Sequence, residues 1–210
     1  MIYLSSYRMG INAGVLRTCG ETERAGIVFN ALDVFGPSRL RSWDREAGDL
    51  SQLGYESEEL DLRQYSHDPE GLAKRLDSLD LVWVVGGNAF VLARAMTTSG
   101  FGTALALALG RGMIYAGYSA GACVAGPDLR GIDLMDNSND VPEGYDANTP
   151  ADTLRLVPFR IVPHWESDHP EAASAQRAVA YLERHSLDYR AIRDGEALIL
   201  GDHAHGEVRS

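Results

Sequence analysis

Residues 113–126, MIYAGYSAGACVAG, decide the fold and single out one serine. Residues 113–116 form an apolar run of the kind that a buried strand needs. The run breaks at residues 117–121, GYSAG, and then resumes with small residues suited to a tightly packed helix. A G-x-S-x-G sequence between a strand and a helix is typical of a sharp, strained turn. Such a turn pushes the central residue, Ser119, out of the sheet with its hydroxyl group exposed.

The residue types around Ser119 suit a nucleophile. Gly117 and Gly121 lack side chains that would collide with the neighbouring strand and helix. A helix that begins at Ser119 points its backbone N–H groups toward the same spot. The N–H of Ala120 is then placed to hold the oxyanion that forms when Ser119 attacks a carbonyl group. A packing turn of small residues could contain a serine by chance, but the strand before it and the helix after it favour the catalytic interpretation.

Length and composition limit the other possibilities. The 210 residues suffice for one α/β domain with a full core, and no linker or repeat divides residues 1–210. The net charge of −11, without a block of lysine or arginine, argues against nucleic acid or an anionic membrane as a partner. Cys19 and Cys123 are the only cysteines, so a reducing cytoplasm is expected. We find no signal peptide pattern and no apolar run long enough to span a bilayer.

The pattern along the chain alternates between strands and helices. Strands are predicted at residues 2–4, 25–32, 55–60, 81–85, 113–116, 155–162, 187–192 and 197–200. Helices are predicted at 39–53, 69–79, 89–96, 101–109 and 171–184, and residues 127–150 read as a long irregular loop. Pro158 suggests an edge strand, and Asp194-Gly195 suggests a hairpin. The expected fold class is α/β, with three layers and a mostly parallel sheet covered by helices on both faces.

In such a sheet, ligands bind at the carboxyl ends of the strands. Two predicted strand ends carry unusual residues, Gly86-Gly87-Asn88 and the turn at Ser119. The backbone N–H of Gly87 could approach a ligand closely and supply a second oxyanion donor. Gly86-Gly87 could equally be an ordinary turn between a strand and a helix, with no role in ligand binding. A phosphate loop is excluded because no G-K-[ST] sequence follows.

A serine nucleophile needs a base, and the chain has six histidines. His164 follows a predicted strand and Pro163, which places it at the same edge of the sheet as Ser119. His169 is the main competitor. The remaining histidines lie in a polar turn, at a helix end and in a polar tail: His67, His185, His203 and His205. With His164 as base, activity should rise with pH through the ordinary histidine range, about pH 6–7.

Three segments in this order resemble one family: VVGGNAF at 84–90, YAGYSAGACVAGP at 115–127 and LVPFRIVPHW at 156–165. They are similar to the dipeptidase E and cyanophycinase group of serine peptidases. The resemblance covers most of the chain. It implies a class I glutamine amidotransferase-like (flavodoxin-like) fold, rather than an α/β-hydrolase fold, and cleavage of a short peptide at its free N-terminus.

The resemblance also implies roles for individual residues. The nucleophile falls on Ser119, the histidine on His164, and the oxyanion donors on the N–H groups of Gly87 and Ala120. The best-known branch hydrolyses aspartyl dipeptides and commonly carries tryptophan where this chain has Tyr118, so aspartyl specificity stays open.

The third member of the triad stays open as well. The spacing of the family falls on Leu134, which Asp133 and Asp136 flank. Asp133 is the first choice and Asp136 the second, and Glu196 could also orient His164. Any of these carboxylates could instead be a solvated loop residue.

The expected function is that of a cytoplasmic serine exopeptidase, monomeric or homodimeric, which acts on short peptides without a metal or other cofactor. Asn88, Tyr118 and Arg130 are the residues expected to bind substrate. Arg130 could pair with an acidic substrate side chain, or it could be a solvated residue paired with Asp128 or Asp133. Two other classes stay open: a binding module that has lost the chemistry, and a glutaminase-type amidohydrolase, which normally has cysteine in place of Ser119.

Overall fold

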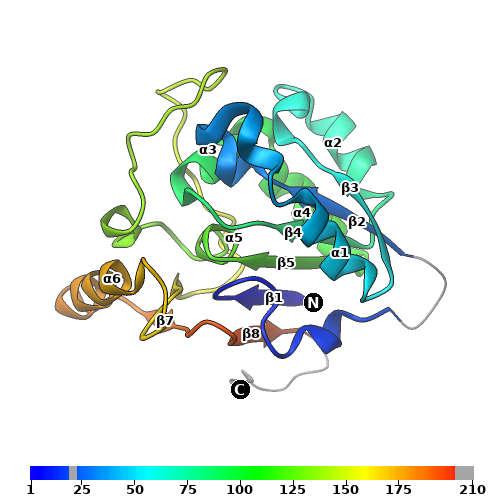
Figure 1. Ribbon diagram of the computed structural model, residues 1–210. Helices are drawn as coiled ribbons and strands as arrows, with labels where there is room; N and C mark the ends of the chain where they lie inside the picture. The colour runs from blue at the N-terminus through cyan, green and yellow to red at the C-terminus, as the bar shows by residue number, and fades with distance from the viewer. Residues whose placement is uncertain (19–22, 202–210) are drawn as a thin grey trace.

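The computed structural model describes residues 1–18 and 23–201 (Figure 1). Cys19, His203 and His205 lie outside the described residues. The main sheet has six strands in the order β3-β2-β4-β5-β1-β8. The first five run parallel, and β8 pairs antiparallel with β1. The strands are β1 (Ile2–Ser5), β2 (Glu23–Val28), β3 (Tyr55–Glu59), β4 (Leu81–Val84), β5 (Ile114–Tyr118) and β8 (Ala197–Leu200). The predicted α/β class with a mostly parallel sheet is confirmed.

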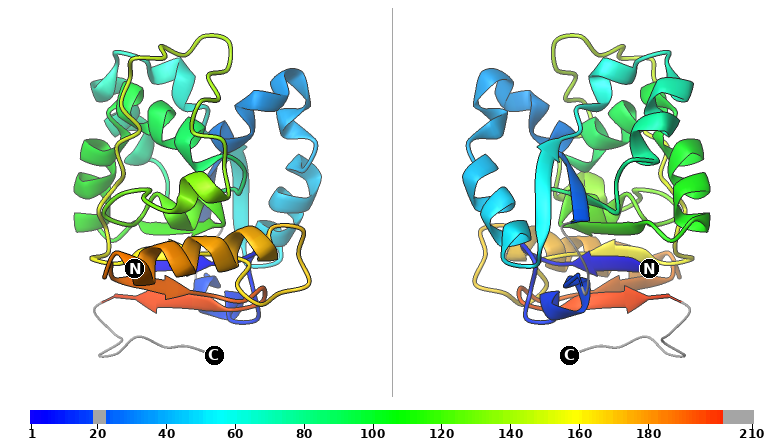
Figure 2. Two further views of the ribbon diagram at one scale, coloured as in Figure 1. Left: turned by 90° about the vertical axis from the view of Figure 1, so that its left-hand side faces the viewer. Right: turned by 90° about the vertical axis from the view of Figure 1, so that its right-hand side faces the viewer.

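Helices cover both faces of this sheet, because the strands alternate their apolar side chains between the two sides. In β4, Val82 and Val84 pack into one apolar cluster, whereas Leu81 and Trp83 pack into another. The first face is covered by α2 (Pro69–Leu76), α3 (Ala89–Ser99), α4 (Phe101–Gly110) and α5 (Ala120–Cys123). The opposite face carries η1 (Ala13–Leu16), η2 (Asn30–Leu40) and α1 (Trp43–Ser51), and Figure 2 shows these layers from two sides.

A second, smaller sheet stands beside the main one. It pairs β6 (Arg160–Val162) with β7 (Tyr189–Ala191) in parallel, and α6 (Ala172–Arg184) packs on it. The predicted strand at 155–162 is wrong in its length, since only its last three residues pair, and they pair with β7 in the two-stranded sheet. The predicted hairpin at Asp194-Gly195 is wrong too, because β7 pairs with β6 whereas β8 pairs with β1. At Asp194 the chain passes from the small sheet to the large one.

The segment after β2 also departs from the prediction. In place of a strand that continues to residue 32, the chain turns into η2 at Asn30, whose side-chain oxygen accepts a hydrogen bond from the N–H of Leu62. The predicted helix at 39–53 is interrupted: η2 ends at Leu40 and α1 begins at Trp43. The loop at 127–150 is irregular as predicted, apart from the single turn η4 (Ile132–Leu134).

None of the described helices is by itself both long and apolar enough to cross a membrane. Helices α3 and α4 meet that criterion only when taken together, and they are bent by 79° where they join.

Candidate active site

The turn after β5 holds Ser119 in a strained backbone conformation, with φ 48° and ψ −114°. A non-glycine residue rarely adopts a positive φ, and here the surrounding structure enforces it. The Ser119 N–H donates to the carbonyl oxygens of Ser5 and Ser6, at 3.2 and 3.1 Å. The flanking glycines are required: a Cβ at Gly117 would lie 2.8 Å from the carbonyl oxygen of Gly121, and one at Gly121 would lie 2.4 Å from that of Val84. The sequence therefore folds here into the sharp strand-to-helix turn that its pattern predicts.

His164 lies between this serine and a carboxylate. Its Nε2 is 3.2 Å from Ser119 Oγ, and its Nδ1 is 2.8 Å from Asp194 Oδ1. Ser119 follows β5, His164 follows β6, and Asp194 lies between β7 and β8, so the two sheets meet at this point. The three side chains form an unbroken chain of hydrogen-bonding groups in the order that a serine, base and acid require.

The Ser6 hydroxyl group forms hydrogen bonds to both His164 and Asp194 and so holds them in place. Its Oγ accepts the backbone N–H of His164 at 2.7 Å and donates to Asp194 Oδ1 at 2.7 Å. The Asp194 N–H in turn donates to Ser167 Oγ at 2.8 Å. A carboxylate fixed beside Nδ1 favours the tautomer that carries its proton there, which leaves the Nε2 lone pair facing Ser119.

The surroundings of the His164 imidazole favour its neutral form. Burial lowers the pKa of His164, because the cation is poorly solvated in the protein interior. The carboxylates of Asp194 and Glu171 oppose this effect, whereas the neighbouring His169 adds to it, and the net pKa of His164 lies below the ordinary histidine value. A neutral imidazole is the form that can accept the Ser119 proton.

His169 supports this base by stacking on it. Its ring lies parallel to that of His164, with centroids 3.7 Å apart and an interplanar angle of 8°. Its Nδ1 accepts the backbone N–H of Glu171 at 3.2 Å. The Tyr7 ring packs against both imidazoles, with centroid distances of 6.1 Å to His164 and 5.5 Å to His169. Of the two competing histidines, the structure brings His164 to the serine hydroxyl.

The carboxylate at Nδ1 is not one of the expected residues. Asp133 is exposed and accepts a hydrogen bond from the Gly131 N–H, and Glu196 accepts one from the Arg193 N–H. Asp136 accepts the Ala89 N–H at the start of α3, and burial raises its pKa to about 7. Of the described carboxylates, only Asp194 lies within hydrogen-bonding distance of His164 Nδ1. In the sequence, Asp194 stood out only because Gly195 follows it, and this pair of residues predicted a hairpin turn and not a catalytic acid.

A cavity of about 380 Å³ opens in front of Ser119 and His164. The residues that line it include apolar side chains, arginines and one carboxylate. The residues that the argument below uses are Phe35, Arg41, Arg45, Gly87, Tyr118 and Glu171.

The Gly86-Gly87 turn forms part of the cavity wall, as the position of the two strand ends predicts. A Cβ at Gly86 would lie 3.0 Å from the Cβ of Ser119, so the turn passes directly beside the nucleophile. Gly87 has a φ of 141°, and a Cβ there would lie 2.5 Å from the carbonyl oxygen of Ala31. Glycine is therefore required at 87 for both backbone conformation and space.

The three expected substrate contacts lie in different places. Tyr118 lines the cavity and donates its hydroxyl proton to the buried Glu46 at 3.0 Å. Asn88 instead caps α3: its Oδ1 accepts the Phe90 and Val91 N–H groups, and its Nδ2 donates to the 137–140 segment.

Arg130 lies outside the cavity wall, fully exposed, with its Nε 3.0 Å from Asp128 Oδ2. Asp128 also pairs with the buried Arg160. The hypothesis that Arg130 reads an acidic substrate is therefore not what this geometry favours, and the alternative of an Arg130–Asp128 pair is what the structure contains.

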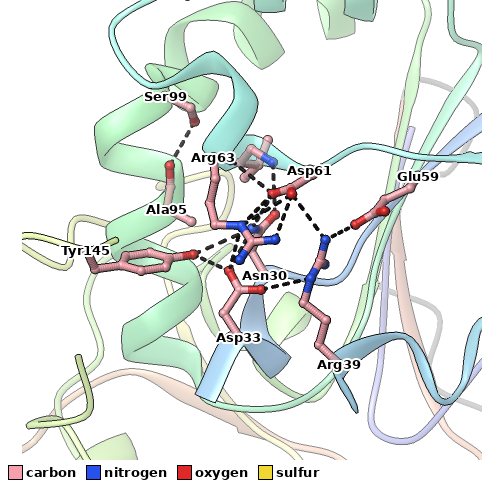
Figure 3. Close-up of polar contacts among 10 residues, drawn as sticks. Asn30, Asp33, Arg39, Glu59, Asp61, Arg63, Ala95, Ser99 and Tyr145 are labelled. Atoms are coloured by element: carbon pink, nitrogen blue, oxygen red, sulfur yellow. Dashed lines mark hydrogen bonds and ion pairs between the residues drawn. The ribbon is translucent and has the colours of Figure 1, made fainter. Parts of the chain in front are cut away.

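The cavity wall contributed by η2 rests on a buried polar cluster, which we call the η2 network (Figure 3). Arg39 pairs with Asp33 at 3.4 Å and with Asp61 at 3.1 Å, and Arg63 pairs with Asp61 at 2.8 Å. The other members are Asn30, Glu59 and Tyr145. The network joins η2 to the segment after β3. It therefore holds in place the part of the cavity wall that η2 forms, which includes Phe35 and is followed in the chain by Arg41.

His164, His169 and Asp194 also place one potential metal-ligand atom each within 4.8 Å of one another. In this arrangement His164 Nδ1 and Asp194 already satisfy each other by a hydrogen bond, and His169 Nδ1 accepts a backbone N–H. The geometry accounts for all three residues as an acid, a base and a stacking partner.

Comparison with known proteins identifies the family of this chain. Residues 43–207 match the family described as peptidase family S51. Peptidase E of Streptomyces coelicolor is 36% identical over 91% of this chain and 77% of its own length. An uncharacterized peptidase of Listeria innocua is 32% identical over 73% of this chain and 69% of its own length.

Solved structures show the same fold. A crystal structure described as a putative peptidase E from Listeria monocytogenes EGD-e superposes with a TM-score of 0.80, at 22% identity, over 100% of this chain and 96% of that one. A peptidase from an acI-B1 actinobacterium superposes with a TM-score of 0.65, at 18% identity, over 94% of this chain and 81% of that one. The family match, the close relatives and the fold lead to one conclusion: this chain belongs to peptidase family S51 and is a serine-type peptidase.

Proposed function

We propose that this peptidase removes the N-terminal residue from short peptides, with Ser119 as nucleophile, His164 as base and Asp194 as the acid of the triad. The observation that carries this proposal is the hydrogen-bonded chain from Asp194 through His164 to Ser119. Asp194 takes the role that the sequence suggested for Asp133. Asp133, Asp136 and Glu196 each accept a hydrogen bond from a backbone N–H elsewhere, so we do not assign this role to them.

In the proposed reaction, Ser119 Oγ attacks the carbonyl carbon of the scissile peptide bond while His164 Nε2 takes the hydroxyl proton. The N–H groups of Gly87 and Ala120 stabilise the oxyanion of the tetrahedral intermediate. The imidazolium of His164 then protonates the leaving amine, and the carbon–nitrogen bond breaks. A water molecule, deprotonated by His164, hydrolyses the acyl-enzyme and restores Ser119. Asp194 holds the imidazole in its tautomer and stabilises its charged form.

The shape and charge of the cavity support a short substrate with an anionic group. A volume of about 380 Å³ suits a peptide of a few residues better than a long chain. Arg41 and Arg45 line its wall, and the Arg45 side chain is 40% exposed, although it also pairs with the buried Glu46 at 2.6 Å. Guanidinium groups at a cavity wall favour a carboxylate, which a dipeptide has at its C-terminus and an aspartyl dipeptide has twice.

A fluorophosphonate probe tests the nucleophile directly. Covalent labelling of Ser119 in the wild type, absent in Ser119→Ala, is expected because only an activated serine reacts. A binding module that has lost the chemistry would remain unlabelled. Digestion of a dipeptide library, with products identified by mass spectrometry, then gives the substrate class. Release of glutamate from glutamine without peptide cleavage would instead indicate a glutaminase.

A further inference from the structure

Glu171 lies beside the proton-transfer atom of the base. Its Oε2 is 3.8 Å from His164 Nε2, the same nitrogen that faces Ser119 Oγ at 3.2 Å. The side chain is 43% exposed and lines the cavity. His164 therefore has a carboxylate on each side: Asp194 at Nδ1, which the triad uses, and Glu171 at Nε2, which the triad does not use.

The Glu171 carboxylate has no evident role in stabilising the fold. Within residues 1–18 and 23–201, no lysine or arginine lies within ion-pair distance of it. Glu171 occupies the N-cap position of α6, but its side chain makes no capping hydrogen bond. Among the described residues its carboxylate contacts His164, whose pKa is lowered by burial although the Glu171 charge opposes that effect. A carboxylate with these properties at a cavity wall is suited to a cation that arrives with the substrate.

The position of Glu171 fits the amino group of a first residue. The scissile carbonyl carbon must approach Ser119 Oγ to about 3–3.5 Å before attack. Standard N–Cα and Cα–C bonds place the amino nitrogen of that same residue only about 2.5 Å from this carbon. A group that binds this nitrogen must therefore lie next to the Ser119–His164 pair, where Glu171 lies.

From this geometry we propose that Glu171 binds the α-ammonium group of the substrate's first residue and thereby restricts the peptidase to free N-termini. This inference rests on the proposed function of the same site. Glu171 neutralises the ammonium charge beside Nε2, where an unpaired cation would disfavour the imidazolium that forms during the reaction. The Glu171 carboxylate also repels a C-terminal carboxylate of the substrate from this part of the cavity.

Binding to an inactive protein tests this role without depending on turnover. In the Ser119→Ala variant, calorimetry compares Leu-Leu with N-acetyl-Leu-Leu, which has the same side chains and no ammonium group. We expect about tenfold tighter binding of Leu-Leu, the lower end of the range for a charge-assisted contact, because Glu171 is partly exposed. Adding Glu171→Gln should abolish this difference.

Asp168→Asn is the matched control. It removes one negative charge from an exposed residue of the same segment, outside the cavity wall, and should leave the preference for Leu-Leu intact. Equal binding of both peptides, no binding of either, or a preference that survives Glu171→Gln would overturn the proposal. Failure of the proposed function is a separate result: the wild type would neither react with the fluorophosphonate probe nor hydrolyse Leu-Leu, whatever the binding preference of the Ser119→Ala variant.

Discussion

Ser119, His164 and Asp194, to which we assign catalysis, form what we call the catalytic corner. This corner and the η2 network both bury carboxylates, but they differ in how those carboxylates are paired. In the η2 network, arginines neutralise the acids: Asp61 accepts hydrogen bonds from both Arg39 and Arg63. In the catalytic corner, the acid faces a neutral imidazole, and the imidazole faces a serine in a strained turn. The first arrangement holds its acids in ion pairs with arginines, whereas the second keeps a proton acceptor at His164 Nε2, next to Ser119.

This difference shows why burial and charge alone do not identify a catalytic site. The pKa of Asp61 departs from its usual value, as that of His164 does. Burial would raise the pKa of Asp61, but hydrogen bonds from Arg63 and Asn30 outweigh burial and lower it. What separates the two regions is the presence of a base that can still accept a proton next to an open cavity.

The first prediction removes the acid from the catalytic corner. Asp194→Asn should lower kcat by about 10³–10⁴-fold, because the amide no longer stabilises the imidazolium or selects the productive tautomer. Steady-state kinetics on a dipeptide substrate measures this loss. Asp133→Asn is the matched control and should stay within a few-fold of wild type, since Asp133 is exposed and contacts the Gly131 N–H. The opposite ranking would return the acid to Asp133.

The second prediction breaks the η2 network. Asp61→Ala should lower the free energy of unfolding by about 3–5 kcal/mol, because it leaves Arg39 buried with fewer counter-charges. Urea denaturation measures this change, and kcat of the folded protein should remain within several-fold of wild type. Asp77→Ala breaks the exposed Asp77–Arg111 pair and should cost at most about 1 kcal/mol. Equal costs for the two variants would contradict the distinction between buried and surface pairs.

The same network should show an acid-sensitive stability. The lowered pKa of Asp61 means that the folded state prefers its ionised form. Its contribution is therefore present above the unfolded value, about pH 4, and is lost as the pH falls through the folded pKa. In the Asp61→Ala variant this part of the pH dependence should be missing.

The third prediction concerns the pH profile of the reaction. Because burial lowers the pKa of His164, kcat/KM should rise with pH to a plateau with a midpoint below about 6.5, the ordinary histidine value. The range of about pH 6–7 expected from the sequence alone overlaps this interval and stays a prediction. Removing the Asp194 charge should shift the midpoint lower still, since that carboxylate raises the pKa of His164. A flat profile between pH 5 and 8 would exclude a histidine base.

Local patterns predicted much of the catalytic corner. The apolar run before Ser119, the two glycines around it and the strand end before His164 are features of neighbouring residues, and each was readable from the sequence. Asp194 was not assigned, because its position depends on a long-range choice: β7 pairs with β6, and β8 pairs with β1. A turn sequence alone does not reveal that the strands on either side enter different sheets.

Proximity in sequence was also a poor guide to the cavity wall. Arg41, Arg45 and Phe35 line the cavity from a segment that the sequence suggested only as a turn and a helix, whereas Arg130, near Ser119 in the chain, does not line it. The chain leaves the site after α5, because the Arg160–Asp128 pair holds the following loop against β6. Which loops surround a site depends on these packing contacts.

The last and smallest expected effect concerns Arg130. Its guanidinium is fully exposed and pairs with Asp128, so Arg130→Ala should change neither kcat/KM nor the ratio of rates on Asp-Leu and Leu-Leu. Arg41 is the matched comparison, because it lines the cavity. If a guanidinium reads an anionic substrate group, Arg41→Ala should weaken that preference by up to about tenfold, through loss of a charge-assisted contact. Kinetics on both dipeptides separate the two arginines. Loss of the Asp-Leu preference in Arg130→Ala alone would mean that the loop at 127–131 folds over the substrate, and that the cavity wall from η2 does not set specificity.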